Sequence, residues 1–224
     1  MENNIEIKKN RLNSVYIVID TSFILKGILQ GYTLDSRALL ERCRHIKNIS
    51  GRSLRFPQGV KTEMLGAIGE CYRNENVREV LRIFHDTRHF PAIPNMEELH
   101  YFDFFKNKVE EIGKRLNNGR DKKDLSPIDI NLGAYSILKT LKGEVILGTQ
   151  DELLINSTWR VHDIASRVFE ERKLSSRKLY LVRTCQDLEN ALENIRAIRN
   201  ERRLISEDYK LEKYSFGFSN CSPS

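Results

Sequence analysis

It is the stretch VYIVIDTS, residues 15–22, that decides the fold class. Its first five residues are apolar and mostly β-branched, so they predict a strand that is buried on both faces, as strands of a parallel sheet are. Asp20 follows at once, which places a carboxylate directly beyond the end of that strand. Three further segments, each mainly apolar, predict strands of the same sheet, at residues 54–56, 144–147 and 178–182.

Helical patterns fill the intervals between these runs. They lie at residues 35–48, 58–71, 75–86, 96–116, 126–142, 158–172 and 187–203. A short edge strand is predicted at residues 89–93, because Pro91 disfavours a central position. Strands that alternate with helices predict an α/β fold, a three-layer α/β/α sandwich around a central, mainly parallel sheet with a C-terminal helix added. The active crevice of such a sheet lies beyond the carboxyl ends of its strands.

The length of 224 residues suits one α/β domain with extensions. We expect a polar N-terminal arm at 1–13, the main domain at 14–190, a helical extension at 191–211 and a mobile tail at 212–224. No apolar run reaches the length of a membrane span, and the N-terminus lacks the apolar centre of a secretory signal, so a cytoplasmic protein without a membrane partner is expected. The four cysteines are scattered, which argues against a zinc ribbon and a disulfide framework.

The formal net charge of +6 favours polyanionic partners. Basic residues form three clusters, at 37–47, 114–123 and 196–203. Each cluster alone is more often a solvated helix face than a binding site. The candidates for contacts with a nucleic acid are Lys122, Lys123, Arg196, Arg199, Arg202 and Arg203.

Four acidic residues stand where the crevice is expected. Asp20 follows the strand at 15–19, Asp151 follows the strand at 144–147, Glu63 lies in the helix at 58–71, and Asp129 lies in the first turn of the helix that Ser126 begins. Each has an ordinary structural role as an alternative. The first two aspartates suit helix N-caps, Asp129 suits a capping box with Ser126, and a lone glutamate on a helix is usually solvated.

The helix behind Asp129 carries small residues on the same face. Asp129, Gly133 and Ser136 recur at i, i+4 and i+7. This small, polar stripe predicts room beside the helix for something other than core.

Together the four acids are more specific than any of them alone. Carboxylates in a small space repel one another, and without a cation at least one would stay protonated near neutral pH. Ligands that are all oxygen, without His or Cys clusters, suit Mg²⁺ or Mn²⁺ rather than zinc. The pattern therefore predicts a magnesium or manganese site.

Four segments resemble, in order, the motifs of the PIN-domain family. They are VIDTS at 18–22, VKTE at 60–63, PIDINLGA at 127–134 and ILGTQD at 146–151. The resemblance spans about residues 14–190. It implies a central parallel sheet, metal held by the acids, and endonucleolytic cleavage of RNA.

Carried over position by position, the resemblance assigns metal binding and catalysis to Asp20, Glu63, Asp129 and Asp151. Thr149 matches a threonine that often precedes the last acid, and Ser22 lies in the first motif. Asp124 is a further candidate acid, although it suits a loop. The chain is longer than the compact toxins of the family and lacks the zinc ribbon of some relatives that process ribosomal RNA.

Other functions stay open from the sequence. A structure-specific DNA nuclease has a related fold, but it usually needs more acids and a longer chain. A non-catalytic protein that binds RNA or serves assembly would keep the fold without the reaction. A homo-oligomer and an inhibitory protein partner are also compatible with the sequence, which identifies neither.

Overall fold

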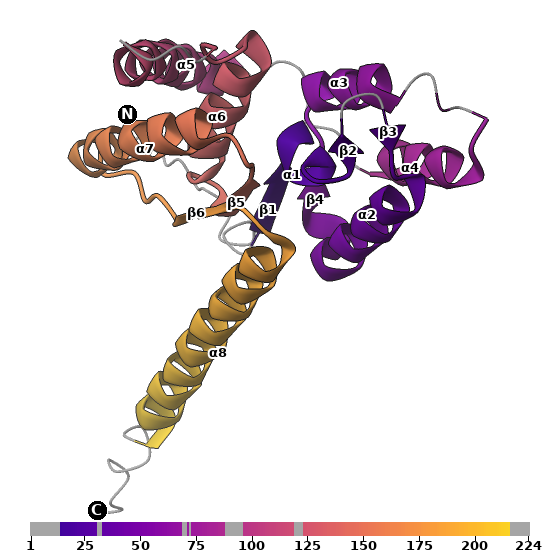
Figure 1. Cartoon of the computed structure of the whole chain (residues 1–224). Helices are drawn as coiled ribbons and strands as arrows, with labels where there is room; N and C mark the ends of the chain where they lie inside the picture. Colours follow the sequence, from indigo (N-terminus) through magenta and orange to yellow (C-terminus); the bar gives the residue numbers. More distant parts are fainter. Residues whose placement is uncertain are drawn as a thin grey trace, which may run out of the picture. The chain divides into compact units, whose positions relative to one another are not determined.

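The computed structural model describes residues 14–30, 33–68, 71, 73–87, 96–118 and 123–215 (Figure 1). The chain divides into two compact units, Met1–Leu188 and Glu189–Ser224. Most of the described residues are helical, and the first unit contains a small four-stranded sheet. Its strands are β1 (Ser14–Ile19), β4 (Leu54–Arg55), β5 (Gly143–Gly148) and β6 (Leu179–Val182). All neighbouring pairs are parallel, so the predicted α/β class with a parallel sheet is confirmed.

The centre of the sheet is apolar on both faces. Ile17, Val18 and Ile19 of β1 are completely buried, and every residue of β5 is buried. Consecutive residues of a strand point to opposite faces, so a strand buried along its length must be covered on both. The backbone pairing continues past the strands, because the N–H of Asp20 donates to the Gly148 carbonyl over 2.8 Å.

The strand order creates a switch point between β1 and β5. The order is β4-β1-β5-β6, so the chain leaves β1 toward one edge of the sheet and returns to form β5 on the other side of β1. Where successive connections leave in opposite directions, a crevice opens at the carboxyl ends of the two central strands. Asp20 and Thr149 are the residues that follow β1 and β5 directly.

The helices of the first unit form two groups beside the sheet (Figure 1). In one group, α6 contacts β1 and β5, and α7 contacts β6. Its members are α5 (Met96–Asn117), α6 (Pro127–Lys139) and α7 (Glu152–Glu171). In the other group, α2 packs on α4, and α1 contacts α2 and α3. Its members are α1 (Thr21–Leu25), α2 (Ser36–Ser50), α3 (Gln58–Ile68) and α4 (Glu75–Asp86).

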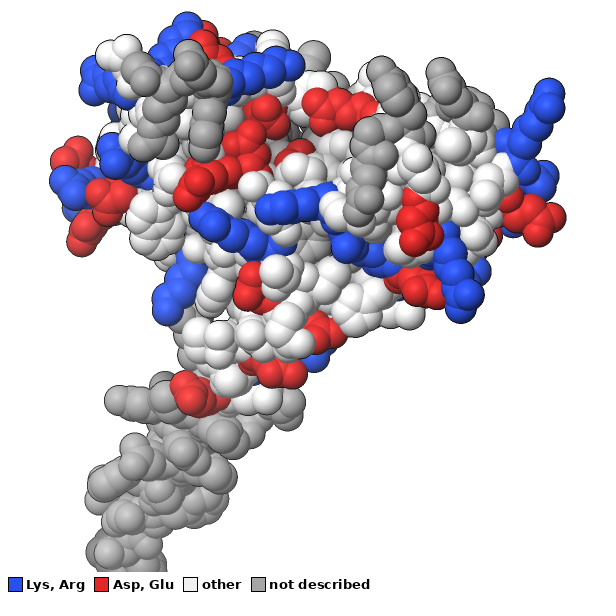
Figure 2. Space-filling model, viewed as in Figure 1, with Lys and Arg blue, Asp and Glu red and all other residues white. Residues whose placement is uncertain are grey.

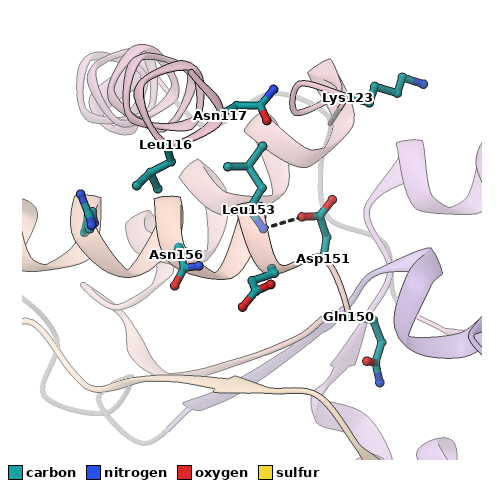
Figure 3. A pocket seen from close by; sticks show the side chains of 9 residues that line it. Leu116, Asn117, Lys123, Gln150, Asp151, Leu153 and Asn156 are labelled. Carbon is teal, nitrogen blue, oxygen red and sulfur yellow. Dashed lines mark hydrogen bonds between the residues drawn. The ribbon is translucent and has the colours of Figure 1, made fainter. Parts of the chain in front are cut away.

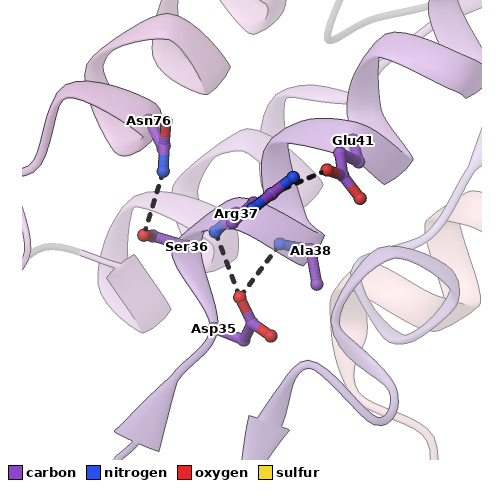
Figure 4. Close-up of polar contacts among 6 residues, drawn as sticks. All are labelled: Asp35, Ser36, Arg37, Ala38, Glu41 and Asn76. Atoms are coloured by element: carbon purple, nitrogen blue, oxygen red, sulfur yellow. Dashed lines mark hydrogen bonds and ion pairs between the residues drawn. The ribbon is translucent and has the colours of Figure 1, made fainter.

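The start of α2 is fixed by polar contacts (Figure 4). Asp35 is its N-cap and accepts hydrogen bonds from two N–H groups of the first turn, including that of Arg37 at 3.1 Å. The Arg37 guanidinium pairs with Glu41 one turn further on. Asn76 of α4 donates to the Ser36 hydroxyl over 3.3 Å, which links the beginnings of two packed helices.

Other cations of the 37–47 cluster also have structural partners. Arg42 donates to the carbonyl oxygens of Ile24 (2.9 Å) and Lys26 (2.7 Å). Arg44 lies 3.9 Å from Glu79 of α4. The cluster therefore joins α1, α2 and α4.

Several element boundaries differ from the sequence prediction. α1 is only five residues long, and a hairpin of β2 (Leu29–Gln30) and β3 (Thr33–Leu34), which the sequence did not predict, follows it. Gly27 ends the helical path with φ at 75°, in the region that favours glycine. α7 begins at Glu152 rather than near residue 158, because Asp151 caps one continuous helix.

The second unit contains most of α8 (Cys185–Ser215). The helix runs beyond the predicted end at 203, so residues 212–215 of the expected tail are helical; residues 216–224, the arm at 1–13 and the edge strand at 89–93 lie outside the described residues. The unit boundary after Leu188 lies near the expected boundary at 190. Among the described residues, no helix is both long and apolar enough to cross a bilayer.

The small residues of α6 serve close packing, and the prediction that their stripe leaves free room was wrong. A methyl group added at Gly133 would lie 2.7 Å from the Thr158 hydroxyl of α7 and 3.4 Å from Val109 of α5. Ser136 is completely buried and donates to the Leu132 carbonyl of its own helix. Glycine at 133 therefore lets three helices approach closely.

We expect the Gly133→Ala substitution to lower the free energy of unfolding by about 1–3 kcal/mol, the usual cost of overpacking. The short, branched Thr158 side chain has no flexible end that could move aside from the new methyl group, 2.7 Å away. Gly66→Ala in α3 is the matched control, since nothing lies within 4 Å of the added carbon there. The control should gain up to about 1 kcal/mol of helix propensity. Equal urea midpoints for both variants would contradict the close packing of α6.

Candidate functional site

Asp20 lies where β1 ends and α1 begins, with only 3% of its surface exposed. It accepts hydrogen bonds from the backbone N–H groups of Thr21 (2.7 Å) and Ser22 (3.3 Å), so it is the N-cap of α1. The hydroxyls of Ser22 and Thr149 also donate to its Oδ2, the second over 2.8 Å. Four donors offset the cost of burying this carboxylate.

Thr149 connects the ends of the two central strands. It is completely buried, donates to Asp20, and accepts a hydrogen bond from the backbone N–H of Asp151 over 3.0 Å. The Ser22 hydroxyl lies 3.2 Å from that of Thr149 and accepts from the N–H of Gln150 over 2.9 Å. These two hydroxyls therefore hold the backbone after β5 against Asp20.

Asp151 is the N-cap of α7. Its Oδ1 accepts from the N–H groups of Leu153 (2.7 Å) and Leu154 (3.0 Å), and Figure 3 shows the first of these bonds. Its Oδ2 has no hydrogen bond with the described residues. One carboxylate oxygen is thus occupied by capping, and the other remains open to a ligand.

Asp129 forms the capping box of α6 with Ser126. The Asp129 N–H donates to the Ser126 hydroxyl over 3.2 Å, and the Ser126 N–H donates to Asp129 Oδ2 over 2.9 Å. Burial raises the pKa of Asp129; the Ser126 bonds oppose this, and the negative charges of Asp20 and Asp151 raise the pKa further. The three aspartates therefore lie within electrostatic reach of one another.

Glu63 reaches the same place from α3. Its Oε2 accepts a hydrogen bond of 2.7 Å from the hydroxyl of Thr21, the residue whose backbone N–H binds Asp20. A single residue thus bridges the two carboxylates. The side chain of Glu63 is half-buried, unlike the solvated glutamate of the ordinary alternative.

The remaining candidates lie in different surroundings. Asp124 is exposed, and its Oδ1 accepts from the Asn117 side chain over 2.7 Å, so it is tied to the end of α5. On α8, Arg196 is exposed and Arg199 half-buried. Lys122 and the side chains of Arg202 and Arg203 lie outside the described residues.

Two clefts meet at Asp151. The larger, which we call the α7 cleft, has a volume of about 560 Å³ (Figure 3). It is lined by Leu116, Asn117, Lys123, Gln150, Asp151, Glu152, Leu153, Asn156 and Arg160. The smaller, of about 370 Å³, is lined by Ser22, Leu25, Lys26, Leu29, Gln150 and Asp151. Figure 2 shows acidic side chains gathered on this face and basic side chains crossing it beside them.

The four acids suit a hydrated divalent cation better than one that they would all bind directly. Among the described residues, no group of three or more His, Cys, Asp and Glu side chains is arranged to hold an ion directly. Mg²⁺, however, usually keeps several waters and binds through one or two carboxylates. An all-oxygen donor set, in which Asp129 feels the charges of Asp20 and Asp151, fits a hydrated ion of this kind.

We expect Asp129→Asn to raise the melting temperature in EDTA at pH 7, by an amount on the order of 2 °C. The pKa of Asp129 is higher in the folded protein than in the unfolded chain. Protonated Asp129 therefore stabilises the folded protein at pH values below the ordinary carboxyl pKa, and this stabilisation is lost as the pH rises through the folded-state pKa. The neutral variant avoids this loss and keeps an oxygen for the Ser126 N–H. Its advantage should vanish near pH 3, and the exposed Asp124→Asn should show none. A variant that is less stable at pH 7 would contradict the coupling of the aspartates.

The sequence did not reveal all members of the site. Thr21 lies beside Asp20 in the first motif, but only the fold brings its hydroxyl to Glu63. Gln150 lines both clefts, accepts from the Lys26 ammonium over 2.9 Å and donates to the Arg183 carbonyl.

Comparison of the chain with models of known families, with curated proteins and with solved structures found no match.

Proposed function

We propose that this chain is a metal-dependent endoribonuclease with a PIN-like, three-layer α/β/α fold. One observation carries the proposal: Asp20, Asp129 and Asp151 lie within electrostatic reach of one another at the carboxyl ends of β1 and β5, and Thr21, next to Asp20, binds Glu63. Burial is the main cause of the raised pKa of Asp129, and the charges of Asp20 and Asp151 add to it. Capping explains each aspartate singly, but it gives no reason for all of them to meet at the switch point. Mutual repulsion is tolerated where it serves a ligand.

Asp20, Asp129, Asp151 and Glu63 would hold Mg²⁺ or Mn²⁺, directly or through water. The Oδ2 of Asp151, which no described residue hydrogen-bonds, and the oxygen of Glu63 that Thr21 does not occupy are the natural points of contact. A bound ion supplies a water of lowered pKa and neutralises charge on the phosphate. RNA hydrolysis needs both.

The other residues of the site act by position. Thr149 and Ser22 fix Asp20 against the turn after β5, and Thr21 holds Glu63. Such partners commonly change metal affinity or activity by about 10–100-fold when they are lost. Lys123 and Arg160 line the α7 cleft, where they would hold the RNA backbone on either side of the cut.

The basic residues of α8 would add affinity without sequence preference. Counterion release makes binding through Arg196, Arg199, Arg202 and Arg203 fall steeply with salt. We expect the chain to act on RNA in the cytoplasm. A homo-oligomer and an inhibitory partner remain compatible with this proposal.

The rival proposal is a non-catalytic protein that binds RNA on the same fold. It keeps the clefts and the cations but has no need of the acids, so it does not account for their convergence. A DNA nuclease would use the same metal chemistry, with DNA instead of RNA as its substrate.

The test is cleavage of labelled single-stranded RNA and DNA of the same sequence, in Mn²⁺, Mg²⁺ or EDTA. The proposal requires RNA cuts with either metal and none in EDTA. Binding without cleavage in any metal would favour the non-catalytic protein, and cuts confined to DNA would favour the other nuclease.

A further inference from the structure

Trp159 is the single tryptophan of the chain and lies on α7 with 56% of its surface exposed. The core face of α7 is filled by other residues, among them Leu154, Val161 and Ala165, so packing does not need the indole. Tryptophan carries a large apolar surface, and leaving it in water forgoes the free energy of burial. The indole contacts the His162 ring, with 6.2 Å between the ring centroids, and its remaining surface is open to a ligand.

The neighbours of Trp159 belong to the α7 cleft. Arg160 follows it in sequence, and Asn156 precedes it by one turn; both line the cleft, and Lys123 lies on the other wall (Figure 3). No other described residue pairs with Lys123 or Arg160. The charge of Asp163, by contrast, is offset by Arg167 over 2.8 Å.

We propose that Trp159 is a stacking platform for one base of a single-stranded RNA whose backbone follows the α7 cleft toward Asp151. This inference rests on the proposed ribonuclease function and names the form of its substrate. The indole face stacks on any base, while Lys123 and Arg160 face the phosphates. A base inside a duplex is already covered by its neighbours, so only an unpaired strand can offer one.

The geometry sets the distance between the stacked base and the cut. Eight residues separate Asp151 from Trp159 along one helix, which corresponds to about 12 Å of rise. At the ~3.4 Å spacing of a stacked strand this spans about three or four nucleotides, and fewer if the strand is stretched. An apolar protein surface would also cover the indole, but Arg160, the next residue, and Lys123, which lines the same cleft, form no ion pair with a described residue and favour a polyanion.

The fluorescence of Trp159 tests the inference without any cleavage. In EDTA, a single-stranded RNA of about ten nucleotides should quench it, and the duplex of the same sequence should not. In a series of RNAs that each lack one base, a single RNA should fail to quench the fluorescence. Its missing base should lie about three or four nucleotides upstream or downstream of the cut.

Substitutions give a second readout. Trp159→Ala should raise KM, and weaken RNA binding measured by anisotropy, by about 5–150-fold, while kcat stays within about twofold. Trp159→Phe should keep most of the affinity. Phe104→Ala is the matched control, because Phe104 is the other exposed large apolar residue described, at 38%, and lies on α5 outside the cleft.

RNA that binds and is cut without quenching Trp159 would overturn the platform and leave the nuclease standing. RNA that neither binds nor is cut would remove the proposed function itself. A change of fluorescence with protein concentration in the absence of RNA would assign Trp159 to a protein interface and overturn the platform as well.

Discussion

Asp20→Asn should reduce metal-dependent RNA cleavage by at least about 10³-fold, which is roughly 4 kcal/mol of transition-state free energy. The change removes the buried charge at the centre of the acids, and an amide cannot offset the charge of a divalent ion. The fold should persist. Asparagine keeps an acceptor for the Thr21 N–H, and the hydroxyls of Ser22 and Thr149 can turn to accept from its amide.

Cleavage rates and thermal unfolding of the same preparations measure both halves of this prediction. Asp124→Asn is the control, because that carboxylate is exposed and tied to Asn117 away from the three aspartates. Its activity should match the wild type. If the Asp20→Asn protein unfolds and EDTA does not affect cleavage by the wild type, Asp20 serves only as a helix cap.

Glu63→Gln should also lower cleavage by orders of magnitude, about 10²-fold or more, by analogy with the loss of other charged groups from metal sites. Its stability should change by no more than about 0.5 kcal/mol. Glutamine can still accept the hydrogen bond that the Thr21 hydroxyl donates over 2.7 Å, so the two residues stay in contact while the charge is lost. If Glu63 is a metal ligand, Glu63→Gln loses cleavage activity but keeps its stability. If Glu63 is an ordinary surface residue, both the cleavage rate and the stability stay near those of the wild type.

Thr21→Val complements this substitution. It keeps Glu63 charged but removes the hydroxyl that holds it, so activity should fall by about 10–100-fold, as for other positioning groups. Full activity of Glu63→Gln would exclude Glu63 and leave a site of three aspartates. Equal, complete losses in both variants would instead indicate that α1 has been displaced.

The sheet was predictable because its central strands carry an unmistakable pattern. Residues 15–19 and 145–147 are continuous apolar runs, and burial on both faces leaves few other structures for them. Ser126 and Pro127 likewise predicted the start of α6, which the capping box confirms. The hairpin after α1 was missed because two-residue strands have too little sequence to show a period.

The site shows a different limit. Sequence order could place Asp20 and Asp151 beyond strand ends, but only the parallel pairing of β1 with β5 brings the Thr149 hydroxyl to Asp20. The stripe through Gly133 was misread because a glycine that makes room for a ligand and one that makes room for a helix look alike in sequence. The distinction lies in what packs opposite, here Thr158.

A crystal soaked in Mn²⁺, measured at the manganese absorption edge, tests the proposed metal site most directly. We expect an anomalous peak bounded by Asp20, Asp129 and Asp151, with Glu63 joined to it directly or through a water, and no such peak in crystals of Asp20→Asn. A well-occupied manganese elsewhere, with these four carboxylates making only the hydrogen bonds of their caps, would contradict it.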